Sequence, residues 1–197
     1  MKTVQKKENR RVRYTRMALR ESLLAQLATT PLGKISVTKV CEQADVNRST
    51  FYMYYKDVYD LMEQIENDFY EELKTLSSKP VTLPNAYNLL TRIYEIIYKN
   101  RDLASVVFGE YGNKQFISKV SGLFHETILE EWRKALDIPD ETSLGYIHTF
   151  SIYTNLGMIE HWISRNFHET PEQLAQMTSD LTAKGLAAFL PQEKPRG

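Results

Sequence analysis

The chain has a single cysteine, Cys41, among its 197 residues, so it can form neither an intrachain disulfide nor a site of several thiolates. It also lacks the run of about 20 apolar residues that a membrane-spanning helix needs. Charged residues occupy the N-terminal stretch where a signal peptide would be hydrophobic. The apolar and polar alternation of a half-buried strand is absent at any length. We therefore expect an all-α, cytoplasmic protein.

Residue patterns for catalysis or metal binding are equally sparse. The eight glycines are scattered and form no loop that could cradle a phosphate. Neither i, i+4 pairing nor HExxH spacing links the four histidines, so a zinc site would need distant partners. These histidines are His125, His148, His161 and His168. We expect no enzymatic activity, no catalytic or metal-binding residues and no cofactor.

Residues 36–61 have the pattern of two short helices joined by a three-residue turn. Apolar residues of the first helix fall at i, i+3, i+4 and i+7, from Val37 to Ala44, and form one buried stripe that includes Cys41. Asp45 occupies the turn position that often needs a left-handed backbone, which Asp tolerates. Asn47 can cap a second helix that starts at the next residue. The pattern predicts a helix-turn-helix.

The exposed side of the second helix indicates DNA as the partner. Arginine can form two hydrogen bonds with guanine, whereas Lys and the hydroxyls of Ser, Thr and Tyr donate to phosphates. We assign Arg48 to base recognition, and Phe51 and Tyr55 to the core. Tyr54 is either a DNA contact or a core aromatic. The complete set of predicted DNA contacts is Thr38, Lys39, Arg48, Ser49, Thr50, Tyr52, Tyr54 and Lys56.

This segment resembles the DNA-binding domain of the TetR family of transcription regulators. The residues that match the family pattern in order are Ser36, Ala44, Val46, Asn47, Ser49, Thr50, Phe51, Tyr52, Tyr55 and Leu61. Two positions depart from the pattern. Asp45 replaces the usual glycine, and Val58 replaces the usual lysine at the start of the fourth helix, which removes one expected phosphate contact. Lys56 is the candidate substitute for that contact.

The charge distribution agrees with a DNA-binding N-terminal region. Residues 1–60 hold twelve Lys/Arg and six Asp/Glu, a net charge of +6, whereas the remainder holds thirteen and nineteen, a net charge of −6. A basic end on an acidic body is expected of a protein that places one end on a polyanion. Residues 1–13 are the most basic, and we predict a flexible arm there. This arm is either a minor-groove or phosphate-contacting extension or a solubilising tail.

The rest of the chain has helical patterns throughout. A first helix at 15–29 completes a three-helix DNA-binding domain over residues 14–60. A helical effector and dimerisation domain is expected over 61–190, followed by a tail at 191–197. Pro80 to Pro84 is the best linker, and Thr170 with Gln173 forms a capping box. The further predicted helices are 58–76, 87–99, 103–110, 114–136, 143–166 and 171–190.

The C-terminal half carries a second resemblance. Residues 98–103, Phe116 with the long amphipathic helix after it, and residues 157–163 are similar to a C-terminal domain of TetR-family regulators of the dihydroxyacetone-kinase-operon type. The resemblance implies a homodimer through the last two helices, on a palindromic operator, with repression relieved by a small effector. In some relatives of this subgroup the effector is a partner protein instead. Activation in place of repression stays open.

Apolar residues cover more than one face of the last two predicted helices, as expected of a dimer interface. They are Ile147, Phe150, Ile152, Leu156, Ile159 and Ile163 in one helix and Leu174, Met177, Leu181, Leu186 and Phe189 in the other. Aromatic residues with polar tips could line an effector cavity, although such residues also fill helical cores. The first candidates for ligand contacts are Tyr94, Tyr98, Trp132 and Tyr153.

Overall fold

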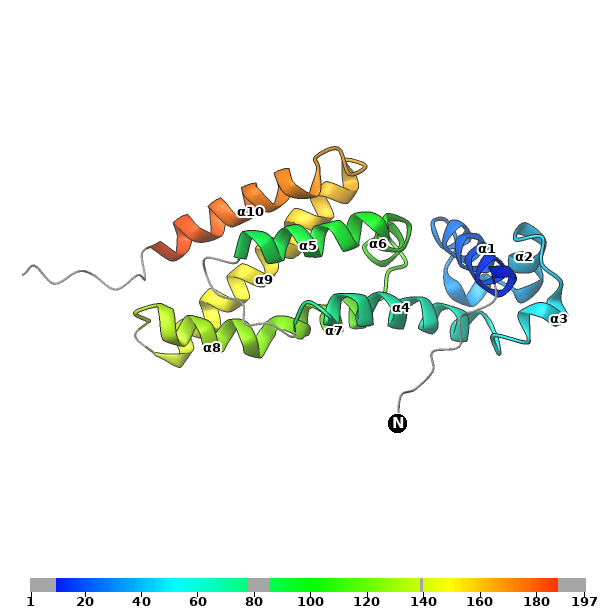
Figure 1. Cartoon of the computed structure of the whole chain (residues 1–197), viewed down its shortest axis with the longest axis horizontal. Helices are drawn as coiled ribbons and strands as arrows, with labels where there is room; N and C mark the ends of the chain where they lie inside the picture. The colour runs from blue at the N-terminus through cyan, green and yellow to red at the C-terminus, as the bar shows by residue number, and fades with distance from the viewer. Residues whose placement is uncertain (1–9, 78–85, 139, 188–197) are drawn as a thin grey trace, which may run out of the picture. The chain divides into compact units, whose positions relative to one another are not determined.

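The computed structural model describes residues 10–77, 86–138 and 140–187, and every regular element in these ranges is a helix (Figure 1). The prediction of an all-α chain is therefore confirmed. None of the helices described is long and apolar enough to cross a membrane.

The described chain divides into two compact units. The head comprises residues 10–69 and 105–113, and the body comprises the other described residues from 70 to 187. The division differs from the one expected at residue 60, because the first part of the fourth helix packs with the head. A short segment from the middle of the chain, 105–113, also returns to the head, which no local pattern had indicated.

The head consists of α1 (Arg10–Leu27), the 3-10 turn η1 (Leu32–Lys34), α2 (Val37–Gln43), α3 (Arg48–Phe51) and the first part of α4 (Val58–Lys74). One face of α1 supplies Leu19 and Leu23, both fully buried, to its core. The buried Ser22 hydroxyl donates to the Val40 carbonyl at 2.9 Å and ties α1 to α2. Helix α2 buries Val40 and Cys41 in the head, and Asn47 caps the start of α3.

The predicted flexible arm is wrong for its last four residues. Helix α1 begins at Arg10, so Arg10, Arg11 and Arg13 belong to its first turns and are exposed there. Arginine is a good helix former, and a helix can extend beyond its apolar stripe without burying a side chain. Residues 1–9 lie outside the described residues, as do the predicted linker at 80–84, Phe189 and the tail at 191–197.

The body contains α5 (Ala86–Lys99), most of α6 (Arg101–Val107), α7 (Lys114–Ser121), the 3-10 turn η3 (Gly122–Phe124), α8 (His125–Ala135), α9 (Glu141–Ser164) and α10 (Pro171–Leu186). Helix α10 runs alongside α5, and α8 packs against α9 (Figure 1). The helix predicted over 114–136 is wrong as a single element. Gly122, with its low helix propensity, begins the 3-10 turn that separates α7 from α8.

Side-chain caps fix the start of both C-terminal helices. The predicted capping box of α10 is confirmed, with the Thr170 hydroxyl accepting from the Gln173 N–H and the Gln173 side chain accepting from the Thr170 N–H. Asp140 accepts from the Ser143 N–H at 2.7 Å, so α9 starts two residues earlier than predicted. This hydrogen bond also holds the pKa of Asp140 below its usual value.

Candidate nucleic-acid interface

Helix α2 has the amphipathic arrangement that its sequence predicts. The Ser36 side chain caps it by accepting from the Lys39 N–H at 3.3 Å. Val40 and Cys41 are buried, whereas Lys39 is exposed and Thr38 is half-buried. Burial raises the pKa of the Cys41 thiol. The assignment of this cysteine to the core is confirmed.

The turn after α2 is closed by a Schellman motif. Asp45 adopts a φ of 51°, the left-handed conformation predicted for it. The Val46 N–H donates to the Cys41 carbonyl at 3.0 Å, and the Asp45 N–H donates to the Glu42 carbonyl at 3.3 Å. These two hydrogen bonds satisfy carbonyls that the end of α2 would otherwise leave unpaired. Asp45 thus adopts the left-handed conformation at the position where the family usually has glycine.

Asn47 caps the start of α3, as predicted. Its side-chain oxygen accepts from the Ser49 N–H and from the Ser49 hydroxyl, at 3.2 Å each. Phe51 is fully buried and Tyr55 is 4% exposed, with ring centroids 5.5 Å apart, so their assignment to the core is confirmed. Arg16 Nε donates to the Tyr55 hydroxyl at 3.2 Å and links α1 to the end of this segment. No local signal could reveal a contact across 39 residues.

The predicted DNA contacts of α3 differ in their exposure. Arg48 and Ser49 are exposed, Tyr52 is 52% exposed, and Thr50 is half-buried. Tyr54 is half-buried too, and its ring packs edge-on against Tyr55 at 6.3 Å, so it contacts a core aromatic, whereas its contact with DNA stays a prediction. The Ser49 hydroxyl would have to leave Asn47 before it could donate to a phosphate.

Lys56 lies just before α4 with an exposed side chain. Its backbone N–H donates to Asp60 Oδ2 at 2.8 Å, and this bond holds the pKa of Asp60 below its usual value. Asp57 caps α4 by accepting from the N–H groups of Tyr59 and Asp60 at 2.9 Å each. Val58 is 5% exposed, so the position where the family usually has lysine contributes to the core of the head.

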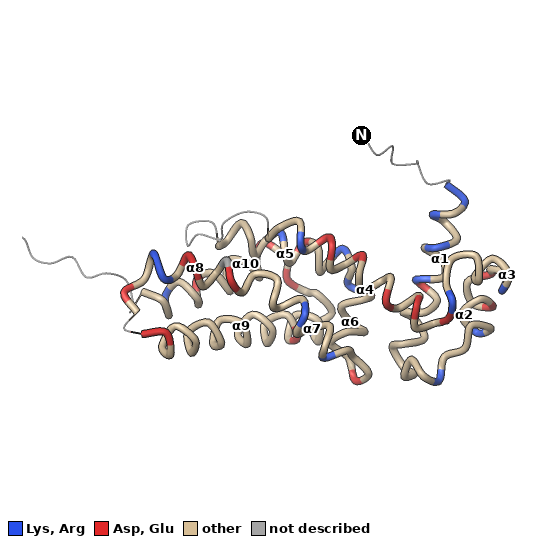
Figure 2. The backbone as a smooth tube through the Cα atoms, turned by 90° about the horizontal axis from the view of Figure 1, so that it is seen from below, with Lys and Arg blue, Asp and Glu red and all other residues tan. Residues whose placement is uncertain are grey.

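Basic residues gather along the head, most densely on α1 (Figure 2). Both signs of charge are interspersed along the body helices in the same view. The exposed residues of the helix-turn-helix include Lys39 and Arg48 but also Glu42 and Asp45, so the basic charge of the head lies mainly on α1. Such a distribution suits contact with a nucleic acid.

The four predicted ligand residues do not share one site. Tyr94 is fully buried, and its hydroxyl lies 3.1 Å from both Asn155 Oδ1 and Thr178 Oγ1. Burial raises its pKa to about 12. Tyr98 is 40% exposed and stacks on Trp162 at 6.0 Å, and Tyr94 contacts the same indole at 5.9 Å.

The other two members of that set lie elsewhere in the body. Trp132 belongs to a separate apolar cluster with Leu129, Leu136 and Leu144. Tyr153 is 71% exposed on α9. Within the residues described, no group of three or more His, Cys, Asp and Glu side chains could hold a metal ion.

The predicted dimer helices leave large apolar side chains uncovered. Tyr146, Phe150 and Tyr153 are each more than 60% exposed and follow one another at i, i+4 and i+7 on α9. Met177 and Leu181 are about half exposed on α10. Three other residues of the predicted interface, Ile159, Leu174 and Leu186, are instead buried in the body itself.

Comparison with known proteins finds similarity to transcriptional regulators. A TetR C-terminal family model, described as the C-terminal region of transcriptional regulators, matches residues 84–184, just over half of the chain. The uncharacterized HTH-type transcriptional regulator YxbF of Bacillus subtilis (strain 168) is 22% identical over 172 residues, which are 84% of this chain. This chain spans only 44% of the length of that relative.

Two solved structures show the fold. The dihydroxyacetone kinase operon activator DhaS is similar with a TM-score of 0.62 and 16% identity, over 90% of this chain and 98% of that chain. A TetR transcriptional regulator from Streptococcus agalactiae 2603V is similar with a TM-score of 0.58 and 20% identity, over 88% and 96%. The matched family model, together with the helix-turn-helix, shows that this chain belongs to the TetR family of transcriptional regulators.

Proposed function

We propose that the protein is a sequence-specific DNA-binding regulator that acts as a cytoplasmic homodimer on a palindromic operator. The observation that carries the proposal is the exposure of Arg48 on a helix whose start is fixed by Asn47 and whose end is anchored by Phe51 and Tyr55. A guanidinium held on a rigid element can form two hydrogen bonds with a guanine edge in the major groove.

The other predicted contacts divide by chemistry and position. Lys39 and Lys56 are exposed cations that flank α3 along the chain and suit phosphates. Tyr52 presents its hydroxyl from the end of α3, and Thr38, Ser49, Thr50 and Tyr54 would add hydroxyl contacts to the backbone. In this scheme the phosphate contacts set the register, and Arg48 supplies base recognition.

The dimer is supported by the uncovered apolar stripes of α9 and α10. Residues 142–159 contain no Lys, Arg, Asp or Glu, although Tyr146, Phe150 and Tyr153 are exposed there. Gly157 continues that stripe by one more turn, and a Cβ at this glycine would meet nothing within 4 Å. Packing within one chain therefore does not explain why position 157 lacks a side chain. A helix of a second copy that crosses closely at this position would explain it.

Selection of bound duplexes from a random pool tests the proposal directly. We expect a two-fold symmetric sequence whose half-sites are separated by about one helical turn, about 10 base pairs, or a multiple of it. Light scattering of the same preparation should give the mass of two chains. Failure to enrich any sequence would contradict specific recognition, and enrichment of a single half-site by a monomer would contradict the homodimer.

We further propose that repression is relieved by an effector that binds the body. Tyr94 and Tyr98 are the residues to test first, because both contact Trp162 and one of them is partly exposed. Replacing Tyr98 by Leu should leave operator affinity unchanged and blunt the response to an inducing metabolite. Trp132 and Tyr153 remain separate candidates, since neither lies in this aromatic group.

The likeness to DhaS, which is named an operon activator, supports a second candidate function. In this alternative the body docks a protein partner, responds to no metabolite and activates transcription. Purified protein added to a reconstituted transcription reaction separates the two, since a repressor lowers transcript yield from its operator and an activator raises it. A thermal-shift screen without a stabilising metabolite, together with a co-purified protein that alters DNA binding, would favour the alternative.

A further inference from the structure

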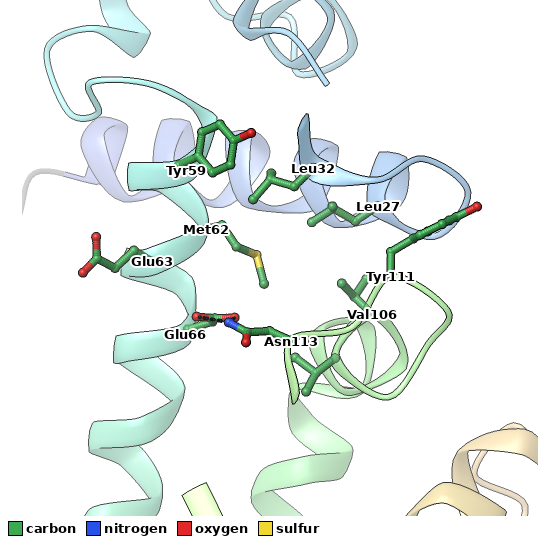
Figure 3. Close-up of a pocket in the computed structure, with 10 residues that line it drawn as sticks. Leu27, Leu32, Tyr59, Met62, Glu63, Glu66, Val106, Tyr111 and Asn113 are labelled. Atoms are coloured by element: carbon green, nitrogen blue, oxygen red, sulfur yellow. Dashed lines mark hydrogen bonds between the residues drawn. The ribbon is translucent and has the colours of Figure 1, made fainter. Parts of the chain in front are cut away.

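A cavity of about 290 Å³ lies within the head, where α4 and the end of α1 meet the segment 105–113 (Figure 3). Its size is close to the lower end of the roughly 300–1,000 Å³ found for small-molecule pockets. The aromatic residues proposed above for effector binding belong to the body, so this cavity is a different site.

The floor of the cavity is apolar. Leu27 of α1, Met62 of α4 and the pair Val106 and Val107 of α6 line it, and each of these side chains is less than 10% exposed. Two tyrosines stand at the rim with larger exposed fractions, 57% for Tyr59 and 43% for Tyr111. A ligand would therefore insert an apolar group and keep a polar group near the tyrosines.

The rim is held in place before any ligand arrives. Asn113 Nδ2 donates to both carboxylate oxygens of Glu66, at 3.0 and 3.3 Å, and so ties the segment that carries Tyr111 to α4. The chain also turns back closely on α6, because a Cβ at Gly112 would lie 1.8 Å from the Val107 carbonyl oxygen. A rim ordered in advance lowers the conformational entropy lost on binding.

The charged residues that line the cavity are acidic. Glu63 and Glu66 are among the lining residues, and none of the lining residues is Lys or Arg. The Glu66 carboxylate points across the cavity side of α4 toward Asn113, whereas Glu63 extends away on the other side of the helix (Figure 3). Glu66 is thus the carboxylate that a ligand in the cavity would meet.

We propose that this cavity binds a small organic cation with an apolar body, such as a protonated arylalkyl amine. The apolar body lies on Leu27, Met62 and Val106, and the ammonium group binds at Glu66. The proposed regulator function does not require this site, and binding can be measured without DNA, so either inference can fail while the other stands.

The probe is 2-phenylethylammonium at neutral pH, titrated into the full-length protein labelled with ¹³C at the methionine methyl groups. Met62 reports on the cavity floor, and the exposed Met177 of α10 serves as an internal reference. We expect the Met62 methyl resonance, identified by its loss in Met62→Leu, to shift with saturation while the Met177 resonance stays in place. The neutral analogue 2-phenylethanol should bind about fivefold more weakly, the upper end for a partly exposed ion pair.

Two substitutions on α4 make a matched pair. Glu66→Gln removes the charge and keeps an oxygen for Asn113, so the protein should fold and bind the amine about fivefold more weakly. Asp68→Asn removes the same charge at an exposed position of α4 that does not line the cavity, and it should leave the affinity within about twofold because water screens that charge. An unmoved Met62 resonance, equal losses in both variants, or equal affinity for amine and alcohol would each overturn the proposal.

Discussion

The exposed side of the helix-turn-helix and the exposed side of α9 have opposite chemistry. Along α2 and α3, exposed positions carry Lys39, Glu42, Asp45 and Arg48, all of which water solvates well. Along α9, the 18 residues from 142 to 159 hold no Lys, Arg, Asp or Glu, yet several large side chains point outward. Water solvates a polar face, so a partner can dissociate from it at little cost in free energy. An apolar face of this length is unfavourable in water and favours a permanent partner.

A charge introduced into the exposed apolar face of α9 should have the largest effect, which is on dimerisation. Phe150→Glu places a charge at the centre of the exposed stripe, and two-fold symmetry would bury it twice in each dimer. We expect dimerisation to weaken by about 4 kcal/mol, or about a thousandfold, with little loss of helix content. Analytical ultracentrifugation over a concentration series measures it. Tyr14→Glu, at an exposed aromatic of α1, is the control, and equal behaviour of both variants would contradict the assignment of the interface to α9.

Substitutions on the polar face of α3 should have a smaller effect on free energy, and for Arg48 that effect should depend on the DNA sequence. Arg48→Ala should cost roughly 1–3 kcal/mol on the selected operator and relax the preference at one base pair. Tyr52→Phe and Thr50→Val should weaken binding to operator and random duplex alike, because phosphate contacts carry no sequence information. Titrations on both duplexes at one fixed salt concentration compare them. Unchanged discrimination in Arg48→Ala would remove this residue from base recognition.

The head and the body also differ in how much of their structure the sequence predicts. In the head, the signals are local, such as the Asn47 cap, the left-handed Asp45 and the stripe that ends at Ala44, and each is decided by residues within one or two turns. The structure therefore agrees with the predicted elements there almost residue by residue. The predicted first helix at 15–29 differs at both ends from α1, which runs from Arg10 to Leu27; its start was misplaced because no periodic apolar residue marks its first turns.

In the body, the missing information is long-range. Tyr94 meets Asn155 and Thr178 across 61 and 84 residues, and no sequence pattern announces that contact. Likewise, the cavity in the head depends on Tyr111 and Asn113 returning to α4 from the middle of the chain. Aromatic composition alone could not separate the buried Tyr94 from the exposed Tyr153, so the four candidate ligand residues were grouped without a shared location.

The turn between α2 and α3 offers a smaller test of local determination. Asp45→Ala should destabilise the protein by about 1 kcal/mol, because alanine tolerates a φ of 51° less well than aspartate does. Asp45→Gly should be neutral within about 0.5 kcal/mol, since relief of strain is offset by the greater freedom of glycine in the unfolded chain. Urea denaturation compares the variants. Glu42→Ala removes an exposed carboxylate from helical backbone, and a loss there equal to that of Asp45→Ala would rule out the conformational cause.

The smallest expected effect concerns a buried polar group of α9. His148 is 5% exposed, and its Nε2 has no hydrogen-bond partner. Its ring lies edge-on to that of His125, with centroids 4.4 Å apart, and the Glu126 carboxylate is 3.6 Å from His125 Nε2. Burial lowers the pKa of His148 below its ordinary value of 6.5, and the neighbouring His125 lowers it further, while Glu126 acts in the opposite direction.

A lowered histidine pKa means that the unfolded chain takes up this proton more readily than the folded one. The contribution of His148 to stability is therefore fully present above pH 6.5 and is lost as the pH falls from there toward the pKa of the folded protein. We expect the melting temperature to fall between pH 7.5 and 5.5, and His148→Leu to flatten this dependence because it removes the titrating group. His161→Leu, at an exposed position of the same helix, should retain the wild-type slope. Parallel slopes for wild type and His148→Leu would show that other groups set the pH dependence of the body.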